Sequence, residues 1–487
     1  MVRVHSIAKA PQQRQTRTAL LLTAITLFGA FLCLLHLGQK SYWWDEIATI
    51  RFARMNPGDF LQSLWRFEAN MSFYYLLVRG WIRFGDSEIW LRLLSAIFAI
   101  ATIPAIYAAG RAVSGRVTGL LAALLLSVNA AHVAYAQEAR GYSLLILLCT
   151  LSLLFFFRSG DAGTGNAVGY VIVSALAVYA HFFAVFFLFA QWVSLLWLPG
   201  NGAHRKKFIL PVSLTLVFIA PALYYMAFRR SAQLGSIPAT KPSDLLQLLY
   251  FLVADLSTFR KELGLIYLLC GGLAVHRALS NRGGAAPSEA RWRILVLVLC
   301  TVLPVAILFP VSFWSPLFLP RYFLICLPPL VLLAAAGLAG VQPASVRLTI
   351  GALIVALSAF SLRWYYAQPK DDWRGVTSYL LQNVRAGDLI VGYPPGAEWP
   401  VQYYFSKAAP DRVPPIRYMT PTELRENLGS LSSDMSRLSR HLWLVDWGNI
   451  PDFRNLQLEL RPDFAVTHEQ SFPGPLTVIS YRSRSVD

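Results

Sequence analysis

The sequence has few charged residues, and this shortage excludes an ordinary soluble domain. Only 14% of its 487 residues are charged, whereas 56% are hydrophobic. A soluble domain usually carries about 25% charged residues. Roughly 20 apolar residues cross a membrane as a helix, so we expect a polytopic protein. The apolar runs are Ala19 to Leu37, Leu91 to Ala109, Gly119 to Ala134, Ser143 to Phe157, Val168 to Leu198, Phe208 to Phe228, Gly264 to Leu279, Ile294 to Phe309, Tyr322 to Ala339 and Leu348 to Leu362.

Cysteine is scarce as well. The chain has 5 cysteines, all of them within apolar runs and none in a paired spacing. Such residues usually act as small buried hydrophobes. The sequence therefore predicts neither a disulfide framework nor a zinc site. These residues are Cys33, Cys149, Cys270, Cys300 and Cys326.

Acidic residues are outnumbered by basic ones, 26 to 43, and the basic residues concentrate in short connectors between apolar runs. This distribution is the positive-inside signal of membrane proteins. The basic start of the chain is placed in the cytoplasm, followed by a retained signal anchor. The run Val168 to Leu198 is interpreted as a hairpin turning near His181, because a single span would put the basic stretch after it outside. The predicted total is about 11 transmembrane helices.

Two domains are predicted. Residues 1–364 form a mainly α-helical membrane domain with an extracytoplasmic loop at 39–90, whose amphipathic stretch Phe73 to Phe84 is too short to span. Residues 365–487 are polar and contain proline, which favours a small extracytoplasmic α/β domain. Its expected strands are Asp388 to Tyr393, Leu442 to Val445 and Leu476 to Tyr481. The expected location is the bacterial inner membrane, with the C-terminal domain in the periplasm.

Acidic residues on the external side are the first candidates for chemistry. Asp45 and Glu46 follow Tyr42, Trp43 and Trp44 directly after the first apolar run. Partial burial at the membrane interface raises carboxylate pKa values and suits a general base. A solvated carboxylate pair beside an interfacial aromatic belt explains the same residues about equally well.

The short turn after Ala134 is the second candidate. It contains Tyr135, Gln137, Glu138, Arg140 and Tyr142. Glu138 and Arg140 are consistent with an exposed ion pair of little consequence, but an arginine at the membrane surface also pairs well with a phosphate.

Arg321 also lies at the outer end of an apolar run, where either a snorkelling cation or a phosphate ligand fits, and the snorkelling cation is the more common of the two. Glu68 lies with Asn70 and Tyr74 where the external segment meets the membrane. Glu68 and His181 could share a divalent metal, although a lone histidine between aromatic residues is more often a hydrogen-bonded core residue.

Several short motifs together resemble the membrane glycosyltransferases of the GT-C fold. More narrowly, the sequence looks like the bacterial relatives of protein O-mannosyltransferases and lipid A aminoarabinose transferases. The resemblance covers nearly the whole chain in order, although Ser72 stands where relatives often have proline. The motifs are Ser41-Tyr-Trp-Trp-Asp-Glu, Glu68-Ala-Asn-Met-Ser-Phe-Tyr-Tyr75, Arg92-Leu-Leu-Ser, Tyr135-Ala-Gln-Glu-Ala-Arg-Gly-Tyr142, Tyr179-Ala-His-Phe, Pro320-Arg-Tyr322 and Asp372-Trp-Arg374.

The resemblance implies an enzyme that moves a sugar from a polyprenyl-phosphate donor to an extracytoplasmic acceptor, usually with inversion. Asp45 would be the general base with Glu46 beside it, and Glu138 would complete the acidic site. Arg140 and Arg321 would hold the lipid phosphate. We expect Asp45, Glu138 and Arg321 to meet at one outer membrane face, with no nucleic acid involved. The substrate pocket would contain Tyr42, Trp44, Asn70, Tyr74, Tyr135, Gln137 and Tyr142.

Two other classes of protein compete with this interpretation. A transporter or lipid-linked sugar flippase would show internal repeats and ionisable residues near the middle of its helices. Here the helix centres are almost wholly uncharged. A receptor would need its external domain to bind the ligand alone, yet the candidate acids belong to the membrane half.

Overall fold

The protein is described by a computed structural model. It describes residues 4–66, 68–159, 164–200, 202–228, 238–254, 257–280, 289–394, 396–410, 417–419, 422–424, 426–427, 441–448, 460 and 464–484. Contacts divide the chain into two compact units. The first, here called the membrane unit, contains Met1–Leu37 and Phe52–Ala367. The second, the C-terminal unit, contains Gly38–Arg51 and Gln368–Asp487. The observed division therefore differs from the predicted one, because a segment of the expected external loop belongs to the C-terminal unit.

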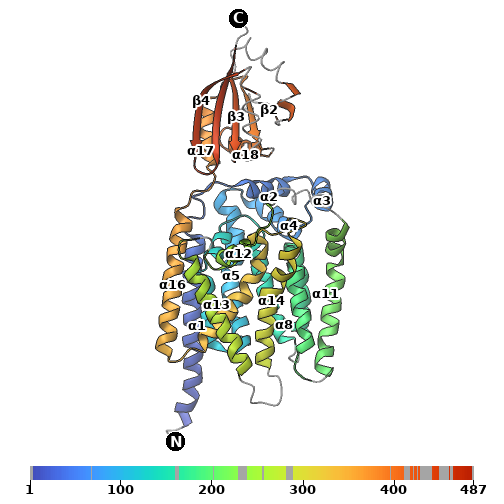
Figure 1. Cartoon of the computed structure of the whole chain (residues 1–487), viewed down its shortest axis with the longest axis vertical. Coiled ribbons are helices and arrows are strands. Elements are labelled where there is room, and N and C mark those ends of the chain that lie inside the picture. The colour runs from blue at the N-terminus through green and yellow to red at the C-terminus, as the bar shows by residue number, and fades with distance from the viewer. Residues whose placement is uncertain are drawn as a thin grey trace. The chain divides into compact units, whose positions relative to one another are not determined.

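The membrane unit is built from helices, and seven in the described residues are long and apolar enough to cross a membrane. The predicted fold class is confirmed: a mainly α-helical polytopic membrane protein with a small C-terminal sheet. These long helices are α1 (Val4–Leu34), α5 (Glu88–Ser114), α11 (Gly202–Phe228), α13 (Arg260–Ser280), α14 (Glu289–Val311), the continuous pair η4 (Pro320–Cys326) and α15 (Leu327–Ala339), and α16 (Ala344–Ala367) (Figure 1).

The remaining apolar helices are shorter or bent. The pair α6 (Arg116–Ser127) and α7 (Ala130–Ala136) bends by 60° at Val128–Asn129. The run expected to form a hairpin is broken at His181, between α9 (Thr164–Ala180) and α10 (Ala184–Ser194). The total of 11 spans stays a prediction. The others are α8 (Tyr142–Arg158), η2 (Leu195–Trp197) and α12 (Asp244–Ala254).

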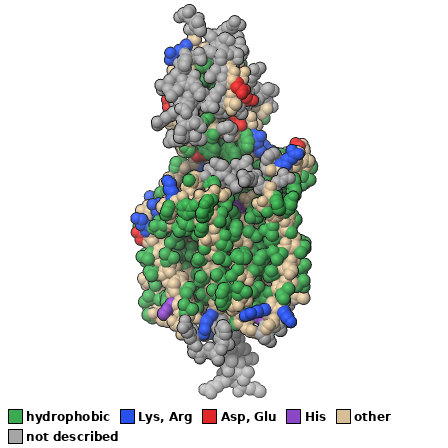
Figure 2. All heavy atoms as spheres, turned by 45° about the vertical axis from the view of Figure 1, so that its right-hand side comes forward, with side chains coloured by type: hydrophobic (Ala, Val, Ile, Leu, Met, Phe, Trp, Pro, Cys, Tyr) green, Lys and Arg blue, Asp and Glu red, His purple; other side chains and the backbone are tan. Residues whose placement is uncertain are grey.

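The outer surface of the membrane unit is apolar, which a water-soluble protein would not tolerate over such an area. On α1, Leu20 and Leu27 are each 65% exposed and Phe31 is 57% exposed. Figure 2 shows the hydrophobic side chains as a broad continuous surface, with Lys and Arg side chains along its lower rim and also near its upper rim. The burial pattern is thus that of helices surrounded by lipid.

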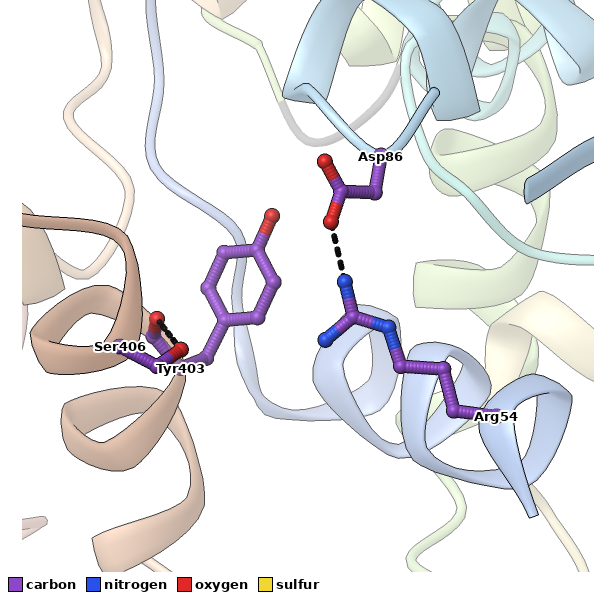
Figure 3. Close-up of polar contacts among 4 residues, drawn as sticks. All are labelled: Arg54, Asp86, Tyr403 and Ser406. Atoms are coloured by element: carbon purple, nitrogen blue, oxygen red, sulfur yellow. Dashed lines mark hydrogen bonds and ion pairs between the residues drawn. The ribbon is translucent and has the colours of Figure 1, made fainter. Parts of the chain in front are cut away.

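Short helices follow α1. They are α2 (Trp44–Arg54), α3 (Pro57–Arg66), α4 (Ser72–Trp81) and η1 (Ile82–Phe84). Within the membrane unit, Arg54 forms an ion pair with Asp86 (Figure 3). The rings of Trp81 and Trp90 stack with centroids 4.6 Å apart, and the Ser87 hydroxyl caps α5 by accepting from the Trp90 N–H. These contacts hold the segment that precedes α5 against the start of that helix.

The C-terminal unit contains a mixed five-stranded sheet in the order β2-β1-β3-β5-β4. Strands β1, β2 and β3 are parallel to one another, whereas β5 is antiparallel to β3 and β4. In α18, the Ser406 hydroxyl donates to the Tyr403 carbonyl at 2.7 Å (Figure 3). The elements are α17 (Trp373–Asn383), β1 (Leu389–Tyr393), α18 (Glu398–Ala408), β2 (Arg417–Met419), β3 (His441–Trp447), β4 (Phe464–Phe472) and β5 (Leu476–Ser483).

The three predicted strands are confirmed as β1, β3 and β5, and each contains a mainly buried segment rich in apolar residues. Two strands were missed. The strand β2 has only three residues, and β4 is largely exposed at the edge of the sheet, so its sequence carries no apolar run. An edge strand of this kind can be polar because only its paired side is covered.

Asp446 lies near the end of the central strand β3 and is only 7% exposed. Its Oδ1 atom accepts no hydrogen bond from the described residues. Burial of the charged form raises the pKa of Asp446 to about 7. The folded protein therefore holds a proton on this carboxyl group at mildly acidic pH.

We expect Asp446→Asn to raise thermal stability at pH 8 and to change it little at pH 4. The folded pKa of about 7 exceeds the unfolded value near 4. The folded state therefore binds more protons between these values, and stability falls as the pH rises through them. Removing the buried charge should gain about 1–3 kcal/mol at pH 8. Thermal unfolding at both pH values tests this, with the exposed Glu469→Gln as control. An unaltered pH dependence in Asp446→Asn would contradict the assignment.

Candidate functional site

The segment Gly38–Arg51 carries the predicted base and packs within the C-terminal unit. The Trp44 ring stacks on Trp399 with centroids 5.2 Å apart, and its Nε1–H donates to the Gly396 carbonyl at 3.1 Å. Gly396 has a φ of 101°, and a Cβ atom there would lie 2.6 Å from Trp44 Nε1. The backbone N–H of Tyr42 donates to the Tyr404 hydroxyl at 2.7 Å. Aromatic stacking and hydrogen bonds thus fix this segment.

The two candidate carboxylates, Asp45 and Glu46, lie in the first turn of α2, where the helix dipole favours negative charge. The Glu46 Oε2 atom accepts a hydrogen bond from the Trp43 backbone N–H at 3.3 Å. Trp43 directly precedes the helix, so Glu46 occupies the position of a capping-box glutamate. Asp45, the preceding residue, is only 8% exposed. The local geometry thus gives Glu46 a structural role and leaves Asp45 as the better candidate for chemistry.

A buried polar chain connects two of the predicted site regions in the membrane unit. Arg140 Nη1 donates to the Tyr75 hydroxyl at 3.2 Å, and that hydroxyl donates to Glu68 Oε1 at 3.1 Å. Arg140 is 8% exposed and Glu68 is 5% exposed. The Arg140 carbonyl accepts from the Ser95 hydroxyl, whose oxygen lies 2.9 Å from the Tyr74 hydroxyl. The arginine is therefore held from both its backbone and its side chain.

Two of the predicted pocket residues have structural partners in the membrane unit. Gln137 Nε2 donates to the carbonyls of Leu35 and Cys33 at 2.6 and 3.2 Å, so it satisfies groups left open at the end of α1. Asn70 Oδ1 accepts from the Phe182 backbone N–H at 3.0 Å, at the break between α9 and α10. Both contacts position the surrounding backbone.

Aromatic rings extend from the turn after α7 to the start of η4. The rings of Tyr135 and Tyr142 are 4.9 Å apart, those of Tyr142 and His181 are 5.8 Å apart, and those of His181 and Tyr322 are 4.9 Å apart. The guanidinium of Arg321 lies 6.0 Å from the Tyr322 ring centroid. The turn, the break after α9 and the start of η4 therefore meet in one place.

His181 is a neutral hydrogen-bond donor in this arrangement. Burial, with the nearby charges of Arg140 and Arg321, lowers the pKa of His181 to about 3. Its Nδ1 atom accepts from the Phe183 backbone N–H at 3.2 Å, so in the neutral ring the proton is on Nε2. Nε2 is buried and bonds to no atom of the described residues. The site thus combines one N–H donor with two nearby guanidinium groups.

The proposed metal pair does not fit this geometry. In the neutral ring the protonated Nε2 of His181 has no lone pair for a metal, because Nδ1 accepts from the Phe183 N–H. The cationic groups that lower the pKa of His181 also disfavour a second cation. In the part of the chain that the structure describes, no group of three or more His, Cys, Asp or Glu residues could hold a metal ion. The arrangement suits an anion instead.

The structure brings together the membrane-unit candidates and adds residues that we did not select. Glu68, Arg140, Tyr142, His181 and Arg321 belong to connected parts of this unit. Tyr75, Ser95 and Tyr322 were missed as site residues, although each stands inside one of the quoted motifs. Tyr42, Trp44, Asp45 and Glu46 belong to the C-terminal unit. The meeting of Asp45 with Glu138 and Arg321 stays a prediction.

We expect Trp44→Ala to loosen the segment that carries Asp45. The substitution removes the stack on Trp399 and the hydrogen bond to Gly396, which together contribute about 2 kcal/mol to local stability. Hydrogen exchange in residues 38–51 of the full chain should accelerate about tenfold or more. Trp314→Ala is the control, because Trp314 is 84% exposed. Unchanged exchange in Trp44→Ala would show that other contacts hold the segment.

Known proteins share this architecture. Residues 73–225 match the family model described as Dolichyl-phosphate-mannose-protein mannosyltransferase. The crystal structure of ArnT from Cupriavidus metallidurans in the apo state matches with a TM-score of 0.58 at 14% identity, over 96% of this chain and 98% of that chain. Its structure bound to undecaprenyl phosphate matches with a TM-score of 0.57 at 14% identity, over 95% and 97%.

The archaeal oligosaccharyltransferase AglB from Archaeoglobus fulgidus, in complex with an inhibitory peptide and a dolichol-phosphate, is also similar. Its TM-score is 0.52 at 10% identity, over 97% of this chain and 75% of that chain. A comparison with curated protein sequences found no match. The expected resemblance is confirmed at the level of architecture: this chain has the GT-C fold of membrane glycosyltransferases.

Proposed function

We propose that the protein is an inverting glycosyltransferase that moves a sugar from a polyprenyl-phosphate donor to an extracytoplasmic acceptor. The acceptor would be an envelope lipid, a glycan or a protein. The observation that carries this proposal is the grouping of Arg140, His181 and Arg321 in the membrane unit. Similar folds in ArnT bound to undecaprenyl phosphate and AglB bound to a dolichol-phosphate support a lipid phosphate as the anion.

The chemistry of such a donor matches these three side chains. During transfer, the bond between the anomeric carbon and the phosphate oxygen breaks, and negative charge grows on the departing polyprenyl phosphate. A fixed guanidinium group stabilises that charge more strongly than water does. Arg140 and Arg321 would supply positive charge, and the Nε2–H of His181 would donate to a phosphate oxygen. The lipid chain of the donor would lie against the apolar helices.

The acceptor needs a base. Its hydroxyl oxygen forms the new bond to the anomeric carbon, and its proton passes to a carboxylate. We assign that role to Asp45, because the neighbouring Glu46 caps α2. We assign Glu138 to the same catalytic site as Asp45, as a second acidic residue. Its backbone carbonyl accepts from the Arg140 N–H at 2.8 Å, so the carboxylate and the phosphate-binding arginine share one turn.

The proposed location is the bacterial inner membrane, with the N-terminus in the cytoplasm and the C-terminal domain in the periplasm. The bias of basic residues toward the connectors on one side supports this orientation. A periplasmic site suits a lipid-linked donor, because nucleotide-linked sugars are made in the cytoplasm whereas a lipid carrier can present its sugar outside.

We expect Asp45→Asn to abolish sugar transfer, because an amide cannot take the acceptor's proton. The loss in kcat should be about 10²–10⁴-fold. The assay uses purified full-length protein with a polyprenyl-phosphate sugar, and quantifies the transferred sugar. Asp59→Asn, an exposed acid on α3, is the matched control and should retain transfer. Full activity in Asp45→Asn would remove the assignment of the base.

We expect Arg321→Ala to lower kcat/KM for the donor by about 10²–10³-fold, the effect of losing one fixed donor to the leaving group. Arg321→Lys should recover part of the activity, because it restores the charge but not the planar fork. Arg363→Ala, an exposed arginine on α16, is the control. If Arg321→Ala had the same kcat/KM as Arg363→Ala, Arg321 would not contact the phosphate.

A flippase for lipid-linked sugars is the alternative, because it would bind the same anion. The two functions differ in their need for two compartments. Sugar transfer by the protein in detergent, where no membrane separates two solutions, would support the enzyme. Movement of a labelled lipid-linked sugar in vesicles, without any transferred product, would support the flippase.

A further inference from the structure

An arginine-lined cavity lies far from the candidate site. It has a volume of about 500 Å³ and opens between α5, α6, α13, α14 and α15. The span Pro320–Ala339 has 20 residues and carries Arg321 at its start, whereas Ala339 and Gly340 at its end line the cavity. Twenty helical residues extend about 30 Å. The cavity is therefore at the opposite end of the membrane unit, a separate place from the candidate site.

Positive charge distinguishes this cavity. Arg116, Arg277 and Arg291 line it, and none of the lining residues that the structure describes is acidic. Arg116 Nη1 donates to the Arg14 carbonyl at 2.8 Å and lies 3.0 Å from the Thr18 hydroxyl, and Arg277 Nη1 donates to the Gly337 carbonyl at 3.2 Å. These acceptors carry no formal charge. Each guanidinium has five N–H donors, so the group can bind an anion while it keeps these contacts.

Small residues create the space. Ala274, Ala278, Ala336 and Gly340 line the cavity between the arginines. A Cβ atom on Gly340 would lie 1.4 Å from Arg277 Nη1, so the glycine allows the guanidinium to cross the end of α15. The volume is within the usual range for a ligand site, about 300–1,000 Å³. The cavity can therefore hold a group larger than a single water molecule.

The surroundings favour a lipid over a soluble anion. Val117 lines the cavity and is 44% exposed, and Leu279 on α13 is 53% exposed. Val117 follows Arg116 directly, and Leu279 lies two residues after Arg277, so exposed apolar side chains stand close to the arginines in the sequence. A phospholipid places its phosphate at the rim of an apolar surface and its acyl chains along the adjacent apolar helices. Basic pockets between transmembrane helices are known to take anionic headgroups.

We propose that the cavity lined by Arg116, Arg277 and Arg291 binds the phosphate headgroup of an anionic membrane phospholipid. The lipid belongs to the leaflet at the N-terminal end of α1, because Arg116 contacts α1 at Arg14 and Thr18. The headgroup would lie between α6, α13 and α14 and contact one arginine from each of these helices. This site is independent of sugar transfer and does not rest on the proposed function.

The test compares two lipids with the same acyl chains, phosphatidylglycerol and phosphatidylcholine, on purified full-length protein. Native mass spectrometry measures how much of each lipid stays bound. We expect phosphatidylglycerol to be preferred, and the double variant Arg277→Gln with Arg291→Gln to reduce that preference about tenfold or more. Arg158→Gln is the matched control, since Arg158 is an exposed arginine at the end of α8 that does not line the cavity.

Because the ratio of the two lipids is measured within each variant, a general loss of folded protein does not change the result. Equal retention of both lipids by the unmodified protein would overturn the proposal. So would an unchanged ratio in the double variant. A third arm adds inorganic phosphate at millimolar concentration. Displacement of phosphatidylglycerol by phosphate alone would assign the cavity to a soluble anion, which also overturns the lipid assignment.

Discussion

The membrane unit depends on keeping two guanidinium groups beside a neutral imidazole at one end of an apolar bundle. Arg140 and Arg321 both lie close enough to His181 to lower its pKa. Like charges in a low-dielectric environment repel, and buried charge is costly unless it is hydrogen-bonded. Arg140 makes such a bond to the Tyr75 hydroxyl, which in turn donates to Glu68. A site built this way is prepared for an anion before the anion arrives, which is the condition for electrostatic catalysis.

The positions of the main elements follow from hydrophobicity, whereas the site does not. Long apolar runs predict helices because the backbone must satisfy its own hydrogen bonds in lipid. The strands β1, β3 and β5 were predictable for a related reason, since each is buried along most of its length. The break at His181 was visible as a run too long for one span. Apolar periodicity thus determines where elements lie, but it says little about which polar side chains meet.

The misassigned segment illustrates that difference. Residues 38–51 follow a membrane helix, so the sequence suggested that they belong to the membrane domain. Their aromatic residues instead pack on the C-terminal unit, where Trp44 stacks on Trp399. The partners are hundreds of residues apart, and no local pattern encodes such a contact. Likewise, Tyr75 was overlooked because a tyrosine on an amphipathic helix is usual, and only its bonds to Arg140 and Glu68 reveal its role.

On the proposed orientation, the arginines at the other end of the unit satisfy two demands with the same charges. Basic connectors retain one side of a membrane protein in the cytoplasm during insertion, and the anionic lipids of that leaflet attract the same residues. Arg277 also donates to the Gly337 carbonyl in the last turn of α15, which accepts from the Gly340 N–H as well. The end of α15 therefore holds the guanidinium group of Arg277 in a defined position. With its guanidinium group fixed in this way, the cavity presents positive charge at a defined position. Recognition of a single headgroup requires such a position.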